Sequence, residues 1–414
     1  MTSAFELARE QYAAWSVDVE AALKRLDSAP LSLHCWQLDD VAGFESAAAL
    51  DGGLAATGNY PGKARTPDEL RADFDQVLSL VPGPCRANVH ACYREASGSP
   101  SDRDAIVPEH YARWLDWAKA RKIGLDFNPT CFSHPKAADG QTLSHPDKAV
   151  REFWIGHCAA SRRVAAHFGR ALGSACVNNV WVPDGMKEAP ADRASPRARL
   201  RESLDRVFAE KLPAGEILDA VEGKLFGIGS ESYVVGSHDF YLAYAVRSGV
   251  MPTFDLGHFH PTESAADKIS STLLFCPRLL LHLSRGVRWD SDHVAIVNDE
   301  LLDVAREAVA GDALGRLRFA LDYFDASVNR VAALAAGARS WRKALLYALL
   351  EPAEKLRAAE AEGDFTARLV WREESKTLAW GAVWDEYCRR QDVPGASWLD
   401  AVRRYEADVL ARRK

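Results

Sequence analysis

Eight short apolar runs, each followed by a stretch with helical spacing, constrain the fold of this chain more than any other feature. The runs cover residues 30–37, 86–93, 122–128, 176–182, 217–224, 251–256, 278–285 and 316–324. Alternation of strand-like and helix-like segments is typical of a parallel sheet with helices packed outside it. Eight such units predict a sheet that closes on itself. We therefore predict an α/β protein, a (β/α)8 TIM barrel.

The two ends of the chain depart from this alternation. Residues 1–26 predict a single amphipathic helix ahead of the first strand. From residue 340 onward the pattern predicts one helix after another, with charge-rich stretches that suit solvated helix faces and no strand-like run. We expect a barrel domain with an N-terminal helix over residues 1–339. A C-terminal helical extension over residues 340–414 should contribute contacts between subunits.

The composition excludes some classes of partner. The formal net charge is −7, whereas a face that binds nucleic acid is normally basic, so we expect no nucleic-acid partner. No apolar run approaches the roughly 20 residues of a membrane helix, and the N-terminal segment lacks the apolar core of a signal peptide. The eight cysteines are scattered without a CxxC pair, which indicates free, mostly buried thiols. We expect a cytoplasmic protein that acts on a small molecule and does not enter a membrane.

Carboxylates and histidines gather at the carboxyl ends of the last four predicted strands. The stretch 254–293 alone, FDLGHFHPTESAADKISSTLLFCPRLLLHLSRGVRWDSDH, carries several of them. These strand ends open onto one face of a barrel, so the side chains should converge there. Carboxylate oxygens and imidazole nitrogens are ligands for divalent ions such as Mn²⁺ or Zn²⁺. The candidate metal ligands are Glu222, Asp255, His258, His282, Asp290, Asp292 and Asp322.

Single residues of this kind also have plainer explanations. A histidine inside a strand, such as His34 or His90, is as often structural as functional, and Asp126 or Asp325 would fit the cap of a following helix. The group of seven is different, because carboxylates so close together cannot all stay ionised without cations between them. The group therefore favours a metal site more strongly than any one member does.

Eight longer strings in the chain carry a family resemblance. They read LHCWQLDDVAGFE, GNYPGKAR, GLDFNPTCFSHP, WVPDGMK, DAVEGKLFGIGSESYVVGS, FDLGHFHPTE, RWDSDHV and LDYFDASVNR. They closely resemble the bacterial L-rhamnose isomerase family, and the likeness extends from the first predicted helix to the C-terminus. The resemblance implies a (β/α)8 barrel with extra helices that works as a homotetramer. It also implies two divalent metals per subunit, commonly Mn²⁺ with Zn²⁺ or Co²⁺ tolerated.

The resemblance also implies how the ligands are divided between the two metals. Those matching the first, substrate-orienting metal are Glu222, Asp255, His282 and Asp322. Those matching the second, catalytic metal are His258, Asp290 and Asp292. In the loop after the first strand, where the family shapes its pocket for the sugar methyl group, this chain has Leu54.

Other residues near the strand ends are candidates for catalysis and for contact with a sugar. Lys224 lies two residues after Glu222 on the same strand face, where its ammonium could reach negative charge developing on a sugar oxygen. Balancing the acidic cluster explains Lys224 equally well, and core packing explains Trp181 equally well. We assign candidate catalytic roles to Lys224, Glu222, Asp322 and His90. Candidate substrate contacts are Trp181, Phe132, Leu54 and Asp184.

The predicted function is that of a metal-dependent aldose–ketose isomerase. The resemblance implies interconversion of L-rhamnose and L-rhamnulose, through ring opening and a metal-assisted 1,2-hydrogen shift. One alternative is an isomerase of another aldose, of the D-allose or D-xylose type. A second is a barrel metallo-hydrolase, such as a phosphoesterase acting on abasic DNA, although its mouth should be basic and this chain is acidic. A third, a sugar-binding protein without turnover, would not need an open position at a second metal.

Overall fold

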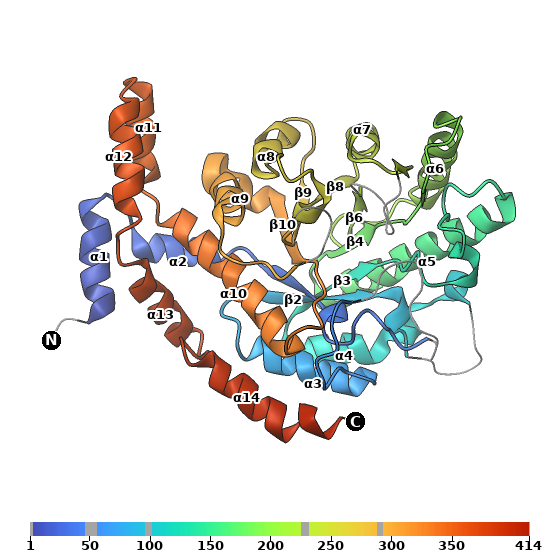
Figure 1. Cartoon of the computed structure of the whole chain (residues 1–414), viewed down its shortest axis with the longest axis horizontal. Helices are drawn as coiled ribbons and strands as arrows, with labels where there is room; N and C mark the ends of the chain where they lie inside the picture. The colour runs from blue at the N-terminus through green and yellow to red at the C-terminus, as the bar shows by residue number, and fades with distance from the viewer. Residues whose placement is uncertain (1–2, 46–55, 96–101, 225–231, 288–292, 414) are drawn as a thin grey trace.

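The computed structural model describes residues 3–45, 56–95, 102–224, 232–287 and 293–413. Eight parallel strands close into a barrel in the order β1-β10-β9-β8-β6-β4-β3-β2, which confirms the predicted fold class (Figure 1). The strands are β1 Leu31–His34, β2 Cys85–His90, β3 Gly124–Asn128, β4 Cys176–Val180, β6 Ile217–Glu222, β8 Met251–Asp255, β9 Leu279–Leu283 and β10 Leu317–Leu321. A short antiparallel pair, β5 Gly185–Met186 and β7 Tyr233–Val234, lies outside the barrel sheet.

Helices cover the outside of the barrel, as Figure 1 shows. They are α3 Pro67–Leu78, α4 Ala112–Arg121, α5 Lys148–Leu172, α6 Ala194–Val207, α7 His238–Ser248, α8 Ala266–Leu273, α9 Asp299–Val309 and α10 Arg330–Leu349. Strands β4, β8 and β9 are buried at every residue, because helices lie on one side of them and the barrel interior on the other. Polar side chains in these strands therefore stand out against an apolar background.

Polar side chains set where several of the helices begin. The Thr66 side chain accepts a hydrogen bond from the amide of Glu69, and α3 opens with Pro67 in its first turn. Asp147 accepts one from the amide of Ala149 at the start of α5. Each of these bonds satisfies an amide that has no partner within its own helix, so the sequence defines the helix starts locally.

The N-terminal segment differs from the single helix that its spacing predicts. It forms two helices, α1 Ala4–Ala14 and α2 Val19–Asp27. Ser16 takes a left-handed backbone conformation with φ of 60°, and the Asp18 side chain accepts hydrogen bonds from two amides in the first turn of α2. A left-handed residue ends one helix and a capping aspartate starts the next, so the prediction of one helix is wrong.

The C-terminal segment is helical, as its pattern predicts. After α10 the chain forms α11 Ala353–Ala361, α12 Phe365–Ser375, α13 Trp380–Arg390 and α14 Trp398–Asp408. In Figure 1 these helices run along one side of the barrel, with α11 and α12 beside α1 and with α14 below α3. Helix α10 covers the barrel and continues across residues 339 and 340. One helix is therefore shared between the barrel and the predicted extension.

Two further observations bear on the composition-based predictions. None of the helices in the described ranges is both long and apolar enough to span a membrane. All eight cysteines are buried and free, which confirms the prediction for the thiols.

Candidate metal centre

Four of the predicted ligands meet at the carboxyl end of the barrel. Glu222 ends β6, Asp255 ends β8, His282 lies in β9, and Asp322 directly follows β10. These strands are consecutive neighbours in the sheet, and Asp255 is paired with His282 in the register of β8 and β9. One ligand atom from each residue lies within 4.8 Å of the others. Closure of the barrel thus brings together side chains up to a hundred residues apart.

The distances around His282 suit a single bound cation. Its Nδ1 lies 3.3 Å from Glu222 Oε1, 3.7 Å from Asp255 Oδ2 and 3.1 Å from Asp322 Oδ2. Ligand atoms that share a metal at about 2.0–2.2 Å are themselves roughly 3 to 4.4 Å apart, depending on the angle between them. The four ligand atoms are therefore already spaced as the first coordination sphere of one ion.

The second oxygen of each carboxylate is held by a donor behind it. Glu222 Oε2 accepts from Asn179 Nδ2 at 2.5 Å, and Asp322 Oδ1 accepts from Trp36 Nε1 at 3.0 Å. Asp255 Oδ1 accepts from the Ser284 hydroxyl at 2.5 Å and from the Gly257 amide at 2.7 Å. Each bond fixes the direction of its carboxylate, so the remaining oxygen points into the cluster.

Several atoms that face the middle of the cluster have no hydrogen bond in the part of the chain that the structure describes. These are Glu222 Oε1, Asp255 Oδ2 and both ring nitrogens of His282, all of them buried. Buried polar atoms are nearly always satisfied, and those that are not need an explanation. A divalent cation coordinated at the centre would satisfy the inward-facing oxygens and one imidazole nitrogen. The residues present therefore fit a metal ion.

The charges of the cluster also favour binding of a cation. Burial lowers the pKa of His282, but Glu222 and Asp322 outweigh burial and raise that pKa well above its ordinary value. Burial and the nearby Glu222 raise the pKa of Asp255. Burial would raise the pKa of Asp322 too, but the contact with His282 lowers it to about 2. A proton on one imidazole leaves three carboxylates under-compensated, which favours a divalent cation.

His258 is the only described member of the second predicted ligand set. It follows β8 and lies partly buried, with Nδ1 3.4 Å from Glu222 Oε1 and 2.8 Å from the carbonyl oxygen of Gly223. A ring N–H donated to a backbone carbonyl leaves the lone pair on the other nitrogen, which is the usual arrangement of a metal-binding histidine. Asp290 and Asp292, the other two members, lie outside the described residues, and so does Leu54.

A row of aromatic rings borders the cluster. Ring centroids are 4.5 Å apart for Trp36 and His90, 5.6 Å for His90 and Phe132, and 6.0 Å for Phe132 and Trp181. Trp36 also donates to Asp322, so the row begins at the acidic cluster itself. The structure thus brings three of the predicted site residues into one apolar wall, as small-ligand sites require.

Lys224 and Asp184 both lie buried near this wall. The Lys224 ammonium donates to the carbonyl oxygen of Pro183 and lies 6.0 Å from the centre of the Trp181 ring. The Asp184 carboxylate accepts hydrogen bonds from the amides and hydroxyls of Thr142 and Ser144, at 2.5–2.9 Å. These bonds tie the loop before α5 to the end of β4. Contact of either residue with a substrate stays a prediction.

The chain is similar to known proteins over its whole length. A family model described as L-rhamnose isomerase (RhaA) matches residues 1–413. The chain belongs to the L-rhamnose isomerase family. Two curated relatives called L-rhamnose isomerase, from Salmonella typhi and Salmonella paratyphi B, are each 57% identical to it over 415 residues, covering 100% of this chain and 99% of each relative. A crystal structure of D-psicose 3-epimerase in the presence of D-fructose has 13% sequence identity and a TM-score of 0.47, and the match covers 77% of this chain and 97% of that one.

Membership of the L-rhamnose isomerase family makes the chain an enzyme, an aldose–ketose isomerase. The family resemblance seen in the eight sequence strings is thereby confirmed. A barrel metallo-hydrolase and a sugar-binding protein without turnover belong to other functional classes, and neither is supported.

Three side chains that contact the cluster were not predicted from the sequence. They are Trp36, Asn179 and Ser284, which hold Asp322, Glu222 and Asp255 in place. One signal was available: Asn178 and Asn179 sit together in a buried strand, where asparagine is depleted. For Trp36 and Ser284 no sequence signal distinguishes the contact from ordinary packing.

Asn179 should control the affinity of the site for metal. Its Oδ1 accepts from the Thr253 hydroxyl at 2.7 Å, which leaves Nδ2 to donate to Glu222. We expect Asn179→Ala to weaken binding of Mn²⁺ by about 10- to 100-fold, the usual cost of losing a side chain that orients a metal ligand. Titration calorimetry of metal-stripped protein would measure this.

Asn178→Ala is the matched control for this variant. Asn178 is the preceding residue of β4 and is just as buried, but its side chain points to the other side of the sheet and lies 3.4 Å from Asp219. Asn178→Ala should lower the stability of the protein by about as much as Asn179→Ala does, but it should leave the affinity for metal unchanged. Equal affinities in the two variants would show that Asn179 does not orient Glu222.

Proposed function

We propose that this enzyme interconverts L-rhamnose and L-rhamnulose. The observation that carries the proposal is 57% identity, across the whole chain, to relatives called L-rhamnose isomerase. The convergent carboxylate–histidine cluster beside an apolar wall supports it, because a sugar offers both neighbouring hydroxyl oxygens and apolar ring faces. An isomerase of another aldose, of the D-allose or D-xylose type, is the alternative within the same class.

We infer that the site holds two divalent ions, with Mn²⁺ as the native metal and Zn²⁺ or Co²⁺ as substitutes. Glu222, Asp255, His282 and Asp322 would hold the first ion. His258, Asp290 and Asp292 would hold the second. When bound, such ions would fix neighbouring sugar oxygens and polarise the carbonyl as Lewis acids.

The protein's own side chains would bind and orient the sugar and stabilise the charge that develops on it. Trp181 and Phe132 would cover the apolar part of the sugar and exclude water, with Leu54 close to the methyl group and Asp184 at the edge of the pocket. The Lys224 ammonium would stabilise negative charge on the sugar oxygen O1. Burial lowers the pKa of His90 to about 3, so His90 is a neutral hydrogen-bonding group near pH 7. Glu222 and Asp322 would keep the reacting oxygens aligned through the metal that they hold.

We predict that the hydrogen moves directly between C1 and C2. The carboxylates nearest the cluster are proposed metal ligands, and both oxygens of Asp184 already accept hydrogen bonds, which leaves no evident side-chain base. When the reaction runs from the aldose in D₂O, NMR should therefore find little deuterium at C1 of the ketose. Stoichiometric incorporation would instead point to proton transfer through a base such as Glu222.

The test of the proposed function is a ketose assay on a panel of aldoses with Mn²⁺ added. L-Rhamnose should give the highest kcat/KM. A clear preference for D-allose or D-xylose would replace the proposal with the alternative isomerase. No ketose from any aldose, in protein shown by elemental analysis to hold metal, would contradict the proposed activity.

We further infer a cytoplasmic homotetramer to which the extension over residues 340–414 contributes contacts. Helix α12 supports this, because Phe365, Leu369 and Val370 are 59%, 62% and 49% exposed in the isolated chain. Apolar side chains grouped on one helix are usual where another subunit packs. Sedimentation analysis should give four chains per particle. A monomer at micromolar concentration would contradict the inference.

A further inference from the structure

The lower half of the barrel interior, beneath the metal cluster, is not filled. Bulky branched side chains normally pack the inside of such a barrel, but here several inward-facing positions are small or polar. A cavity of about 360 Å³ lies among them. We call it the barrel-floor cavity. Its lining includes Arg86, Asp126, Ser174, Asn179, Arg318 and Ala320, and Gly315 at its mouth is exposed.

Two arginines line the barrel-floor cavity, and only one of them has a carboxylate partner. Arg86 donates to both oxygens of Asp126, each at 2.9 Å, and to the Ser174 hydroxyl at 2.6 Å. Arg318 donates only from Nη1, to the carbonyl oxygens of Leu317 at 2.9 Å and of Gly315 at 3.4 Å. Within the described part of the chain no carboxylate pairs with Arg318, so the cavity carries one uncompensated positive charge.

This uncompensated charge is costly where it lies. Arg318 is partly buried at the start of β10. Burial together with the nearby Arg278 and Arg86 lowers the pKa of its guanidinium, and Asp126, which is paired with Arg86, offsets only part of this. A charge withdrawn from water without a partner destabilises the protein, and a bound anion would relieve that cost. Arg318 still has Nε and Nη2 to donate, because neither makes a hydrogen bond within the described residues.

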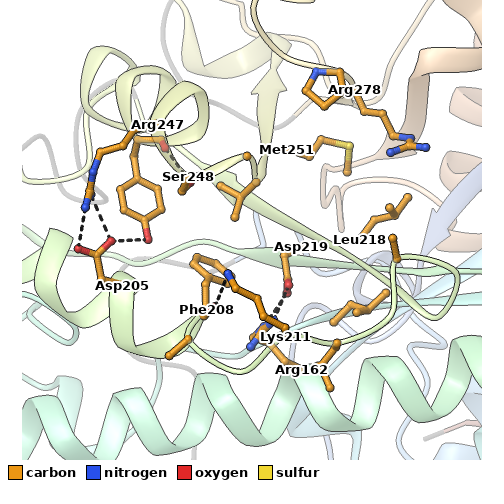
Figure 2. Close-up of a pocket in the computed structure, with 18 residues that line it drawn as sticks. Arg162, Asp205, Phe208, Lys211, Leu218, Asp219, Arg247, Ser248, Met251 and Arg278 are labelled. Atoms are coloured by element: carbon orange, nitrogen blue, oxygen red, sulfur yellow. Dashed lines mark hydrogen bonds and ion pairs between the residues drawn. The ribbon is translucent and has the colours of Figure 1, made fainter.

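A second cavity at the same end of the barrel differs from the barrel-floor cavity in how its charged side chains are paired. Figure 2 shows this cavity, of about 480 Å³, at the starts of β6 and β8. Its buried cation, Arg162, lies 2.8 Å from Asp219, and the exposed Arg247 lies 3.2 Å from Asp205. The other cations on its lining, Lys211 and Arg278, are exposed. Water solvates exposed cations well, so this cavity has no comparable need for an anion.

We propose that the barrel-floor cavity binds a small oxyanion, a phosphate or a carboxylate, through Arg318. The Ser174 hydroxyl accepts from Arg86, which leaves its own proton to donate toward the cavity. A planar guanidinium with two remaining donors suits bidentate binding of such an anion. Asn179 lines the same cavity and donates to Glu222. The anion would therefore sit directly below the side chain that orients one of the proposed metal ligands.

Titration calorimetry of the metal-loaded enzyme, in buffer free of oxyanions, tests this proposal. Inorganic phosphate and acetate are the two probes, and at least one should bind once per chain; the tighter one assigns the anion class. Arg318→Gln keeps a polar side chain but removes the charge, and should weaken binding by at least about tenfold, since a hydrogen bond to an ionised group is lost. Lys211→Gln is the matched control. It removes an exposed cation from the other cavity and should leave binding unchanged.

Two further measurements separate the cavity from other sites. Ala320→Leu fills part of the cavity while keeping Arg318, so it should weaken binding as well, and it provides the test if Arg318→Gln does not fold. Binding should persist after the metal is stripped, since phosphate held by the metal centre would be lost with it. The proposal is overturned if neither anion binds saturably, if either variant folds and binds like the wild type, or if binding disappears with the metal.

Discussion

Removal of metal with a chelator should abolish ketose formation and lower the melting temperature by several degrees, and Mn²⁺ should restore both. The expectation rests on the cluster at the carboxyl end of the barrel. There Glu222, Asp255 and Asp322 direct one oxygen each toward His282, and the four residues lie on four neighbouring strands. Without a cation these carboxylates repel one another in a buried setting, and that repulsion opposes folding of the strand ends that carry them.

The size of the effect follows from mass action. A ligand that binds only the folded state stabilises it by about 2.7 kcal/mol when present at 100 times its Kd. Chelator saturated beforehand with Mn²⁺ is the control, since it reproduces every effect of the reagent except removal of metal. Full activity in protein that elemental analysis finds free of metal would contradict the metal dependence of the enzyme.

The barrel and the principal ligands could be predicted because parallel strands buried on both faces are nearly continuous apolar runs. Within such runs a polar residue is conspicuous, and its place at the carboxyl end of a strand puts it on the functional face. His282 in the run LLLHL and Asp255 at the end of MPTFD are of this kind. To predict that these side chains converge, only the order of the strands in the sheet is required, and the regular alternation of strand and helix indicates that order.

The residues that orient the ligands could not be predicted in this way. Asn179 lies 43 positions from Glu222, and Trp36 lies 286 positions from Asp322. Such contacts depend on the register between strands and on the direction of each side chain. Neither can be predicted from the sequence of one segment alone. The same is true of the barrel-floor cavity, which exists because small side chains from different strands meet inside the barrel. The break between α1 and α2 is a different case, since the capping role of Asp18 is local and was available from the sequence.

The two proposed metals should respond differently when a ligand is lost. Glu222, Asp255, His282 and Asp322 come from four strand ends, so their ion would tie four elements of the barrel together. Asp322→Asn should therefore lose metal, activity and several degrees of melting temperature at once. Asp290 and Asp292 are close together in sequence, and in the second ligand set only His258 comes from another strand. An ion held mainly by one segment should contribute little to the stability of the barrel.

Asp290→Asn should accordingly lower turnover by orders of magnitude while the melting temperature and one tightly bound metal per subunit survive. Elemental analysis and thermal unfolding of both variants in the same buffer measure the difference. Asp116→Asn, at an exposed position on α4, is the control for loss of one negative charge. The first ion stabilises the barrel independently of the second only if the two variants differ in melting temperature and metal content. A carboxylate shared by both ions would couple them. If Asp290→Asn releases both metals, or unfolds at as low a temperature as Asp322→Asn, the two ions form one coupled unit whose loss removes stability and catalysis together.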